Sequence, residues 1–135
     1  MTKLKTKLYE SFNLAELKCD FMGYEFEIKK ELTYHHILPK NYGGKTSFKN
    51  GALLIRPSHD YIHIIEAIDF KLFIEISHEL KQEHEKGEIT KERLLNIRQM
   101  LEFFENKNKN SYAKNGTPLI KDDFVRRRID FSGKS

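Results

Sequence analysis

The stretch TYHHILPKNYGGKTSFKNGALLIRPSHDYIH, residues 33–63, holds four of the six histidines in this chain of 135 residues. Two of the four are adjacent, and the other two have the spacing H-x-x-x-H. Between the pairs lie strong breakers of regular structure, which are Pro39, the Gly43–Gly44 pair and Asn50–Gly51. A loop this long in a small chain usually carries function. The stretch therefore predicts a functional site at which a loop brings histidines together.

Strands are expected on both sides of the loop. Before it, residues 19–37 are rich in aromatic and β-branched residues and are expected to form pieces of strand, with a turn at Gly23. After it, residues 52–56 (ALLIR) are expected to form a short apolar strand. Two strands joined in this way predict an antiparallel hairpin with an unusually long connection.

A long helix is expected next, with Ser58 as its N-cap. Its apolar residues recur at helical spacing up to about Lys86, and Gly87 is expected to end it. Asp69 falls where this spacing calls for an apolar residue, which predicts a bend or break within residues 67–70.

The rest of the pattern predicts one domain, residues 1–105, with its motif core at residues 32–66. Residues 3–18 have the spacing of a short amphipathic helix, and Thr90 is expected to cap a further helix. Residues 106–135 are rich in Asn and Lys, then in Arg, and are expected to form a linker and a basic C-terminal tail.

Composition excludes several classes of protein. The single cysteine, Cys19, excludes a disulfide within the chain and a zinc site built from several thiolates. No apolar run is long enough for a membrane span and the N-terminus does not resemble a signal peptide, so we expect a cytoplasmic protein without a membrane partner. The net charge of +4 fits a polyanionic partner, although ordinary solvated surface also explains it. The high content of Lys, Asn and Ile is typical of an AT-rich bacterial or phage genome.

The spacing of His59 and His63 predicts a chelating pair. Residues four apart on a helix lie on one face, about one turn from each other, and imidazole is a common ligand of transition metals. Two unrelated surface histidines on one face are the alternative. The position of the pair at the start of a helix that follows the hairpin favours the metal site.

The adjacent pair, His35 and His36, predicts a division of roles. Successive side chains of a strand point to opposite faces, so only one of the two histidines is expected to join the helical pair at a metal. The other would lie close to the metal as a free proton acceptor. Two incidental histidines on an exposed strand are the alternative. Asn50, late in the loop, has an amide that could tie the backbone of the loop together.

Residues 32–63 resemble the signature of the HNH endonucleases, which is close to HHI-x-P-x-x-x-GG, then Asn, a short strand and H-x-x-x-H. The elements occur in order and at the expected spacings. The resemblance implies an α+β fold, in which a ββα-metal finger (two strands and a helix around one divalent cation) is joined by additional packed helices. It also implies hydrolysis of DNA phosphodiester bonds by a single-metal mechanism, leaving 5′-phosphate and 3′-hydroxyl ends.

Carried over by position, the resemblance makes His35, His59 and His63 the metal ligands. His36 would be the general base and Asn50 the residue that organises the loop. The resemblance implies one divalent ion. Mg²⁺ or Mn²⁺ is the first expectation, and the all-imidazole ligand set also allows Zn²⁺ or Ni²⁺.

The chain departs from many members of that family at residues 19–23. CDFMG looks like a CxxCG zinc-knuckle element in which Met22 replaces the second cysteine, and the chain has no later cysteine pair. Hydrophobic packing is therefore expected to brace the finger in place of a second zinc.

DNA is the expected partner. The basic residues expected to contact phosphates are Lys40, Lys45, Lys49 and Arg56 near the motif and Arg126, Arg127 and Arg128 in the tail. Two other functions stay open: a non-catalytic module that holds zinc and binds DNA or protein, and a nuclease subunit that needs a targeting partner. The helices of residues 58–104 could also supply a homodimer face.

Overall fold

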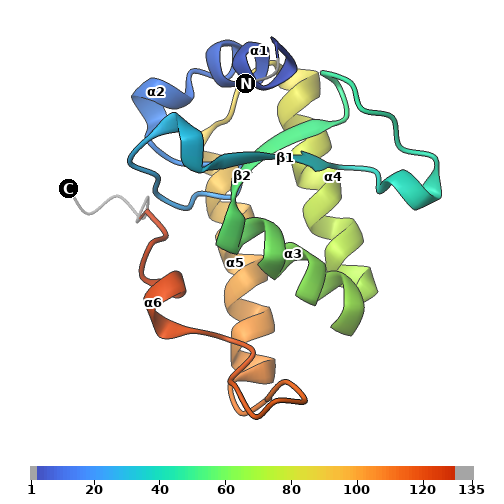
Figure 1. The fold of residues 1–135 in the computed structure, drawn as a ribbon, viewed down its shortest axis with the longest axis vertical. Coiled ribbons are helices and arrows are strands. Elements are labelled where there is room, and N and C mark those ends of the chain that lie inside the picture. Colours follow the sequence, from blue (N-terminus) through green and yellow to red (C-terminus); the bar gives the residue numbers. More distant parts are fainter. Residues whose placement is uncertain (1–2, 130–135) are drawn as a thin grey trace.

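The computed structural model describes residues 3–129, apart from the side chain of Asp122, and has a mixed α+β fold (Figure 1). In chain order its elements are α1 (Lys3–Ser11), α2 (Leu14–Leu17), the 3-10 helix η1 (Lys29–Glu31), β1 (Leu32–His36), the 3-10 helix η2 (Lys40–Tyr42), β2 (Gly51–Ile55), α3 (Arg56–Ile68), α4 (Phe70–Lys86), α5 (Lys91–Asn108) and α6 (Asp122–Val125). The α+β prediction is confirmed at this level.

The sheet consists of β1 and β2, which pair antiparallel so that His35 lies opposite Ala52 and His36 opposite Gly51. This is the predicted hairpin with its long loop. The predicted strand pieces of residues 19–31 are wrong. The structure of that segment has the short helix η1 and two isolated bridges, which join Cys19 to Glu25 and Tyr24 to Arg128. The buried carboxylate of Asp20 accepts from the backbone N–H groups of Met22 and Tyr24, and the N–H of Gly23 donates to the carbonyl of Asp20. These backbone groups are therefore not available for a strand ladder.

Helix α3 follows β2 without a loop and packs against both strands (Figure 1). The prediction of Ser58 as N-cap is wrong, because the helix already begins at Arg56 and has no side-chain cap. Ser58 is fully buried and its hydroxyl donates to the sulfur of Met22 at 3.7 Å. Pro57, in the first turn, suits this start because its ring fixes φ and it lacks an N–H.

The predicted break between α3 and α4 is confirmed at Asp69. This residue leaves the helical conformation, and its side chain caps α4 by accepting a hydrogen bond from the N–H of Leu72 at 3.1 Å. Gly87 ends α4 with a positive φ of 76°, and the hydroxyl of Thr90 caps α5 by accepting from the N–H of Arg93, both as predicted. Helices α4 and α5 then run side by side (Figure 1).

The N-terminal segment forms two helices, where the sequence pattern predicts one, and α1 packs against β2. Asn13, in a left-handed conformation, separates α1 from α2. Cys19 and Met22, the positions of the missing zinc knuckle, are buried in the core. Between them, the carboxylate of Asp20 accepts from the backbone N–H groups of Met22 and Ile55 at 2.9 and 3.0 Å, which ties this segment to the end of β2. Packing therefore does brace the hairpin.

The described part of the expected linker and tail lies against the domain. Beyond α5 the chain turns back and runs up to α6 (Figure 1). The N–H of Ile129 donates to the carbonyl of Gly23 at 2.9 Å, and the N–H of Glu25 donates to the carbonyl of Arg127 at 2.8 Å. Helix α5 also continues beyond residue 105, the expected boundary. Residues 130–135 of the expected tail lie outside the described residues.

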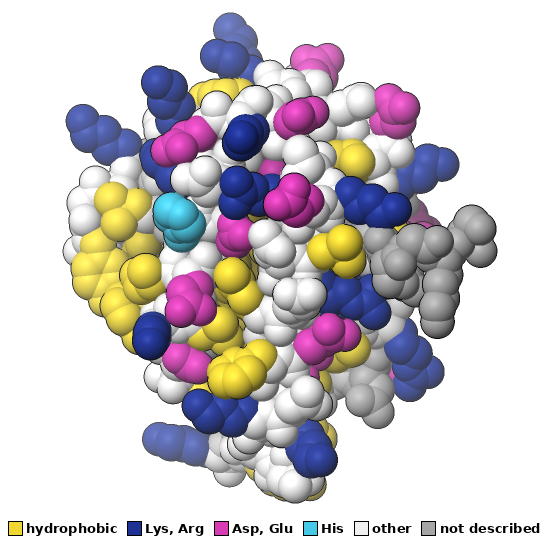
Figure 2. All heavy atoms as spheres, turned by 180° about the vertical axis from the view of Figure 1, so that it is seen from behind, with side chains coloured by type: hydrophobic (Ala, Val, Ile, Leu, Met, Phe, Trp, Pro, Cys, Tyr) yellow, Lys and Arg dark blue, Asp and Glu magenta, His cyan; other side chains and the backbone are white. Residues whose placement is uncertain are grey.

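The surface carries charges of both signs, and Figure 2 shows lysine and arginine side chains interspersed with acidic ones across the rear face. Some large hydrophobic side chains are also exposed to solvent: Phe70 and Ile74 on α4 and Phe103 on α5 are about half exposed. Among the described residues, none of the helices is long and apolar enough to cross a membrane.

Glu83 on α4 provides a test of the core. Its carboxyl is fully buried, and burial raises its pKa to about 8. In the unfolded chain a glutamate has a pKa of about 4.3, so the folded state holds this proton more tightly. The contribution of Glu83 to stability is therefore complete below the unfolded pKa and is lost as the pH rises through about 8. We expect the Glu83→Gln variant not to show this loss. At pH 8 its free energy of unfolding should exceed that of the wild type by roughly a few kcal/mol.

Urea unfolding at pH 5 and pH 8 measures this effect, with Glu75→Gln, an exposed position on the same helix, as control. The control should keep the pH dependence of the wild type. An equal loss of stability between the two pH values in wild type and Glu83→Gln would contradict the expectation.

Candidate metal centre

Three histidines converge between β1 and α3. One ring nitrogen from each of His35, His59 and His63 lies within 4.8 Å of the others. The ring centroid of His35 lies 5.1 Å from that of His59 and 5.6 Å from that of His63. The ring centroids of His59 and His63 are 5.1 Å apart. We call these three residues the histidine triad. It is the ligand set that the resemblance in the sequence implies.

Strand alternation and helix periodicity produce this convergence. His35 points from β1 toward α3 and is 1% exposed, while His59 and His63 lie one turn apart on the facing side of the helix. His35 therefore joins the helical pair and its neighbour His36 does not, which is the division predicted for the adjacent histidines.

His35 is the side chain that most needs a ligand. Both of its ring nitrogens are buried without a hydrogen-bond partner among the described residues. Burial, with smaller contributions from His59 and His63, lowers its pKa to about 3, so the ring is neutral at physiological pH. A buried polar group with no partner costs about 1–3 kcal/mol, and a metal ion would satisfy one of these nitrogens with its lone pair.

The hydrogen bonds of Thr33 determine the tautomer of His59. The single hydroxyl proton of Thr33 is donated to the carbonyl of Leu54 at 2.7 Å. The 3.0 Å contact between the Thr33 oxygen and Nδ1 of His59 must then have the imidazole as donor. The lone pair is therefore on Nε2, as a metal ligand requires. Burial, with His63 nearby, also lowers the pKa of His59 and favours its neutral form.

Glu66 has the corresponding role for His63. Its carboxylate lies 3.0 Å from Nδ1 of His63 and accepts a hydrogen bond there, which places the lone pair of the neutral ring on Nε2. Metal-binding histidines almost always donate their second ring N–H in this way. The residues of the triad thus fit a divalent ion in number, in spacing and in tautomer.

Thr33 and Glu66 are site residues that the sequence analysis missed. The signals were present, because Thr33 precedes His35 by two residues on the same strand face and Glu66 follows His63 by three on the helix. Neither spacing is specific enough to be recognised without the contacts.

His36 lies beside the triad and outside it. Its Nε2 is 2.8 Å from the hydroxyl of Thr46, and its ring packs edge-on against Tyr34 at 4.9 Å. A hollow of about 310 Å³ joins it to the triad, and the residues that line the hollow are His35, His36, Pro39, Lys40, Asn41, His59, His63 and Glu66. A small anion in this hollow would meet the triad and His36 together.

Asn50 closes the loop as the sequence predicts. Its side-chain oxygen accepts from the N–H of Leu38 at 2.8 Å, and its Nδ2 donates to the carbonyls of Leu38 and Lys45 at 3.1 and 2.9 Å. Gly44 permits the same closure, because a Cβ atom there would lie 1.8 Å from the carbonyl oxygen of Leu38. These contacts hold the chain that follows His36 in one conformation.

The basic residues proposed from the sequence differ in placement. All four basic residues near the motif are exposed, and Lys40 also lines the hollow. In the tail, Arg126 is largely exposed, with its guanidinium 3.7 Å from Asp123. Arg127 lies 3.6 Å from Glu31 and donates to the carbonyl of Glu25. Arg128 is almost fully buried against Glu105.

Thr33→Val tests the hydrogen bond behind the triad. Valine has nearly the shape of threonine but cannot accept from His59, so the ring loses the group that fixes its tautomer. Such outer-shell changes typically lower metal affinity by about 10–100-fold, and we expect a loss in this range. Calorimetric titration with Zn²⁺ measures it, and Thr117→Val, at an exposed threonine, should leave the affinity unchanged. Equal affinities for both variants would contradict the tautomer argument.

Comparison with known proteins found no family model, no curated protein and no solved structure that matches this chain.

Proposed function

We propose that this protein is a metal-dependent endonuclease of the HNH type, and that β1, β2 and α3 are its ββα-metal finger. It would hydrolyse phosphodiester bonds of DNA. The observation that carries the proposal is the triad, with its lone pairs oriented inward, beside a further histidine that is not part of it. The order of the motif along the sequence supports the same assignment.

The roles of the side chains follow from their positions. A divalent ion held by the triad would stabilise the charge that develops on the phosphate and on the leaving 3′ oxygen. His36 takes a proton from the attacking water. When its Nε2–H donates to Thr46, Nδ1 carries the lone pair for this step. Asn50 keeps the loop closed and so holds the chain after His36 in place. In-line attack would leave 5′-phosphate and 3′-hydroxyl ends.

DNA would approach over the hollow. Lys40 is placed to contact the phosphate that enters it, and the exposed side chains of Lys45, Lys49 and Arg56 could hold neighbouring phosphates. Arg126 is available for a more distant contact. We leave Arg128 out of the proposed interface, because its guanidinium is buried in an ion pair.

The number of ligands favours catalysis over a structural zinc module. Structural zinc sites are almost always closed by four protein ligands, whereas catalytic sites commonly have three and keep one position open. The group found among the described residues has three histidines and opens into a hollow. A purely structural site would also have no use for His36. A nuclease subunit that requires a targeting partner fits the same geometry and is the second candidate.

Cleavage of supercoiled plasmid in the presence of Mg²⁺, Mn²⁺, Ni²⁺ or Zn²⁺ tests the proposal. We expect nicked or linear product with at least one metal, none with EDTA, and product ends that a ligase can rejoin. Metal and DNA binding should be measured on the same preparation. Binding of both without cleavage in any metal would contradict the nuclease and favour the binding module or the partner-dependent subunit.

A further inference from the structure

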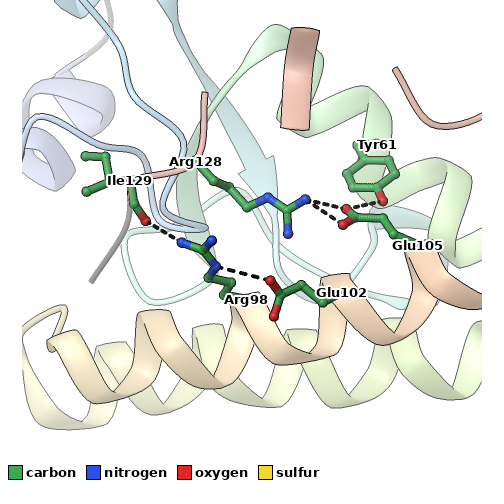
Figure 3. A network of polar contacts seen from close by, with 6 residues as sticks. All are labelled: Tyr61, Arg98, Glu102, Glu105, Arg128 and Ile129. Carbon is green, nitrogen blue, oxygen red and sulfur yellow. Dashed lines mark hydrogen bonds and ion pairs between the residues drawn. The ribbon is translucent and has the colours of Figure 1, made fainter. Parts of the chain in front are cut away.

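The back of α3 is attached to the rest of the protein through Tyr61. This residue lies midway between His59 and His63, and because each helical residue advances by about 100°, its side chain points away from the triad. It is buried, and its hydroxyl donates to Oε2 of Glu105 on α5 at 2.8 Å (Figure 3).

The same carboxylate binds the C-terminal segment. Nη2 of Arg128 lies 2.6 Å from both oxygens of Glu105, and the Arg128 side chain is only 5% exposed (Figure 3). Next to it, Nη1 of Arg98 on α5 donates to the carbonyl of Ile129 at 3.2 Å. Glu105 therefore links α3 to residues near the C-terminal end of the described chain. We call residues 119–129 the strap.

Apolar contacts follow the same route. Phe124 of the strap stacks on the ring of Tyr24 at 4.2 Å and packs edge-on against the ring of Tyr61 at 5.1 Å. Tyr61 is thus held by its ring and by its hydroxyl, in both cases from the side opposite to the triad. The two contacts restrict rotation of α3 about its own axis.

That rotation matters for the metal site. His35 is fixed in the sheet, so a ligand set within 4.8 Å forms only when α3 presents both of its histidines toward β1. A turn of α3 would move His59 and His63 together and separate them from His35. The contacts of Tyr61 therefore control the rotation of α3 about its axis, on which the geometry of the triad depends.

We propose that the strap is a brace for metal binding, in which Arg128 and Tyr61 are positioning residues that hold α3 in the orientation required by the triad. The inference rests on the metal centre of the proposed function, but not on nuclease activity. Its consequence is that a change more than sixty residues along the chain from His63 alters the metal affinity of the triad.

Calorimetric titration of the full-length protein with Zn²⁺ tests the brace. We expect Arg128→Ala and Tyr61→Phe each to weaken zinc binding by about tenfold or more, by analogy with outer-shell residues. Arg128→Lys should recover most of the affinity, because a single nitrogen of Arg128 makes both contacts with Glu105. The matched control is Arg93→Ala, which breaks a 2.7 Å ion pair with Glu79 that joins α4 to α5 and does not involve α3.

Hydrogen exchange of the metal-free protein gives a second readout. The amides of α3 should exchange faster in Arg128→Ala than in Arg93→Ala, with both variants studied well below their unfolding temperatures. Wild-type zinc affinity and wild-type exchange of α3 in Arg128→Ala would overturn the brace, as would equal losses of affinity in Arg128→Ala and Arg93→Ala. If the wild type itself binds no metal, the metal centre of the proposed function fails. The two failures are therefore distinguishable.

Discussion

Replacing His36 with alanine is expected to lower the rate of DNA cleavage by about 10²–10⁴-fold, the usual contribution of a general base. The fold should persist, because the side chain is only partly buried and its contacts with Thr46 and Tyr34 are one hydrogen bond and one ring contact. Zinc affinity should also persist, since His36 is not a member of the triad. Plasmid nicking rates, with circular dichroism and zinc titration on the same samples, measure the three properties.

His78→Ala is the matched control for this experiment. It removes an exposed histidine from α4, away from the motif, and should cleave at the wild-type rate. Cleavage by His36→Ala at that rate would rule out His36 as the base. A variant that neither cleaves nor binds zinc would instead indicate that His36 supports the structure of the site.

Replacing His35 with leucine is expected to abolish metal binding without weakening the metal-free protein. The two ring nitrogens of His35 are buried and have no hydrogen-bond partner within residues 3–129, so an apolar side chain of similar size should leave the metal-free stability unchanged or higher. With free Zn²⁺ at 100 times its Kd, the wild type should gain about 2.7 kcal/mol. Without its buried ligand the variant should gain little. Urea unfolding with and without zinc gives both values.

His84→Leu should show the opposite pattern. Nε2 of His84 donates to the carbonyl of Gly51 at 2.6 Å, so its loss leaves a backbone acceptor unpaired. This variant should lose stability in both conditions and keep the zinc increment. If His35→Leu loses as much metal-free stability as His84→Leu, or keeps the zinc increment, then His35 is an ordinary core residue.

Much of the local structure could be predicted from the sequence, and the reason is that it depends on near neighbours. The break at Asp69 and the cap at Thr90 follow from side chains that act within a few residues of themselves. The end of α4 follows from the left-handed conformation that Gly87 adopts without a steric penalty. Ser58 shows the limit of such rules. A serine near the start of a helix is a good cap in isolation, but here tertiary packing moved the helix start and buried the hydroxyl against Met22.

The candidate site also has some features that local sequence patterns predict and others that depend on tertiary packing. The alternation of a strand and the period of a helix were enough to predict that one of two adjacent histidines would join His59 and His63. Strand alternation and helix periodicity do not predict which side chains form hydrogen bonds with the ligands from behind. Those contacts, such as that between Thr33 and His59, depend on how α3 is placed on the sheet.

The sequence by itself determined the four histidines of the motif, their spacing, the loop closed by Asn50 and the order of hairpin and helix, because each is a property of one short segment. Only the tertiary structure decided that His35 would be buried with both nitrogens unpaired in the described part of the chain, and that the strap would fold back onto α5. These features join residues far apart in the chain, and they form only when the free energy of packing selects one arrangement of the elements. The pairing of Arg128 with Glu105 belongs to this second group, since composition alone suggested a basic tail for DNA.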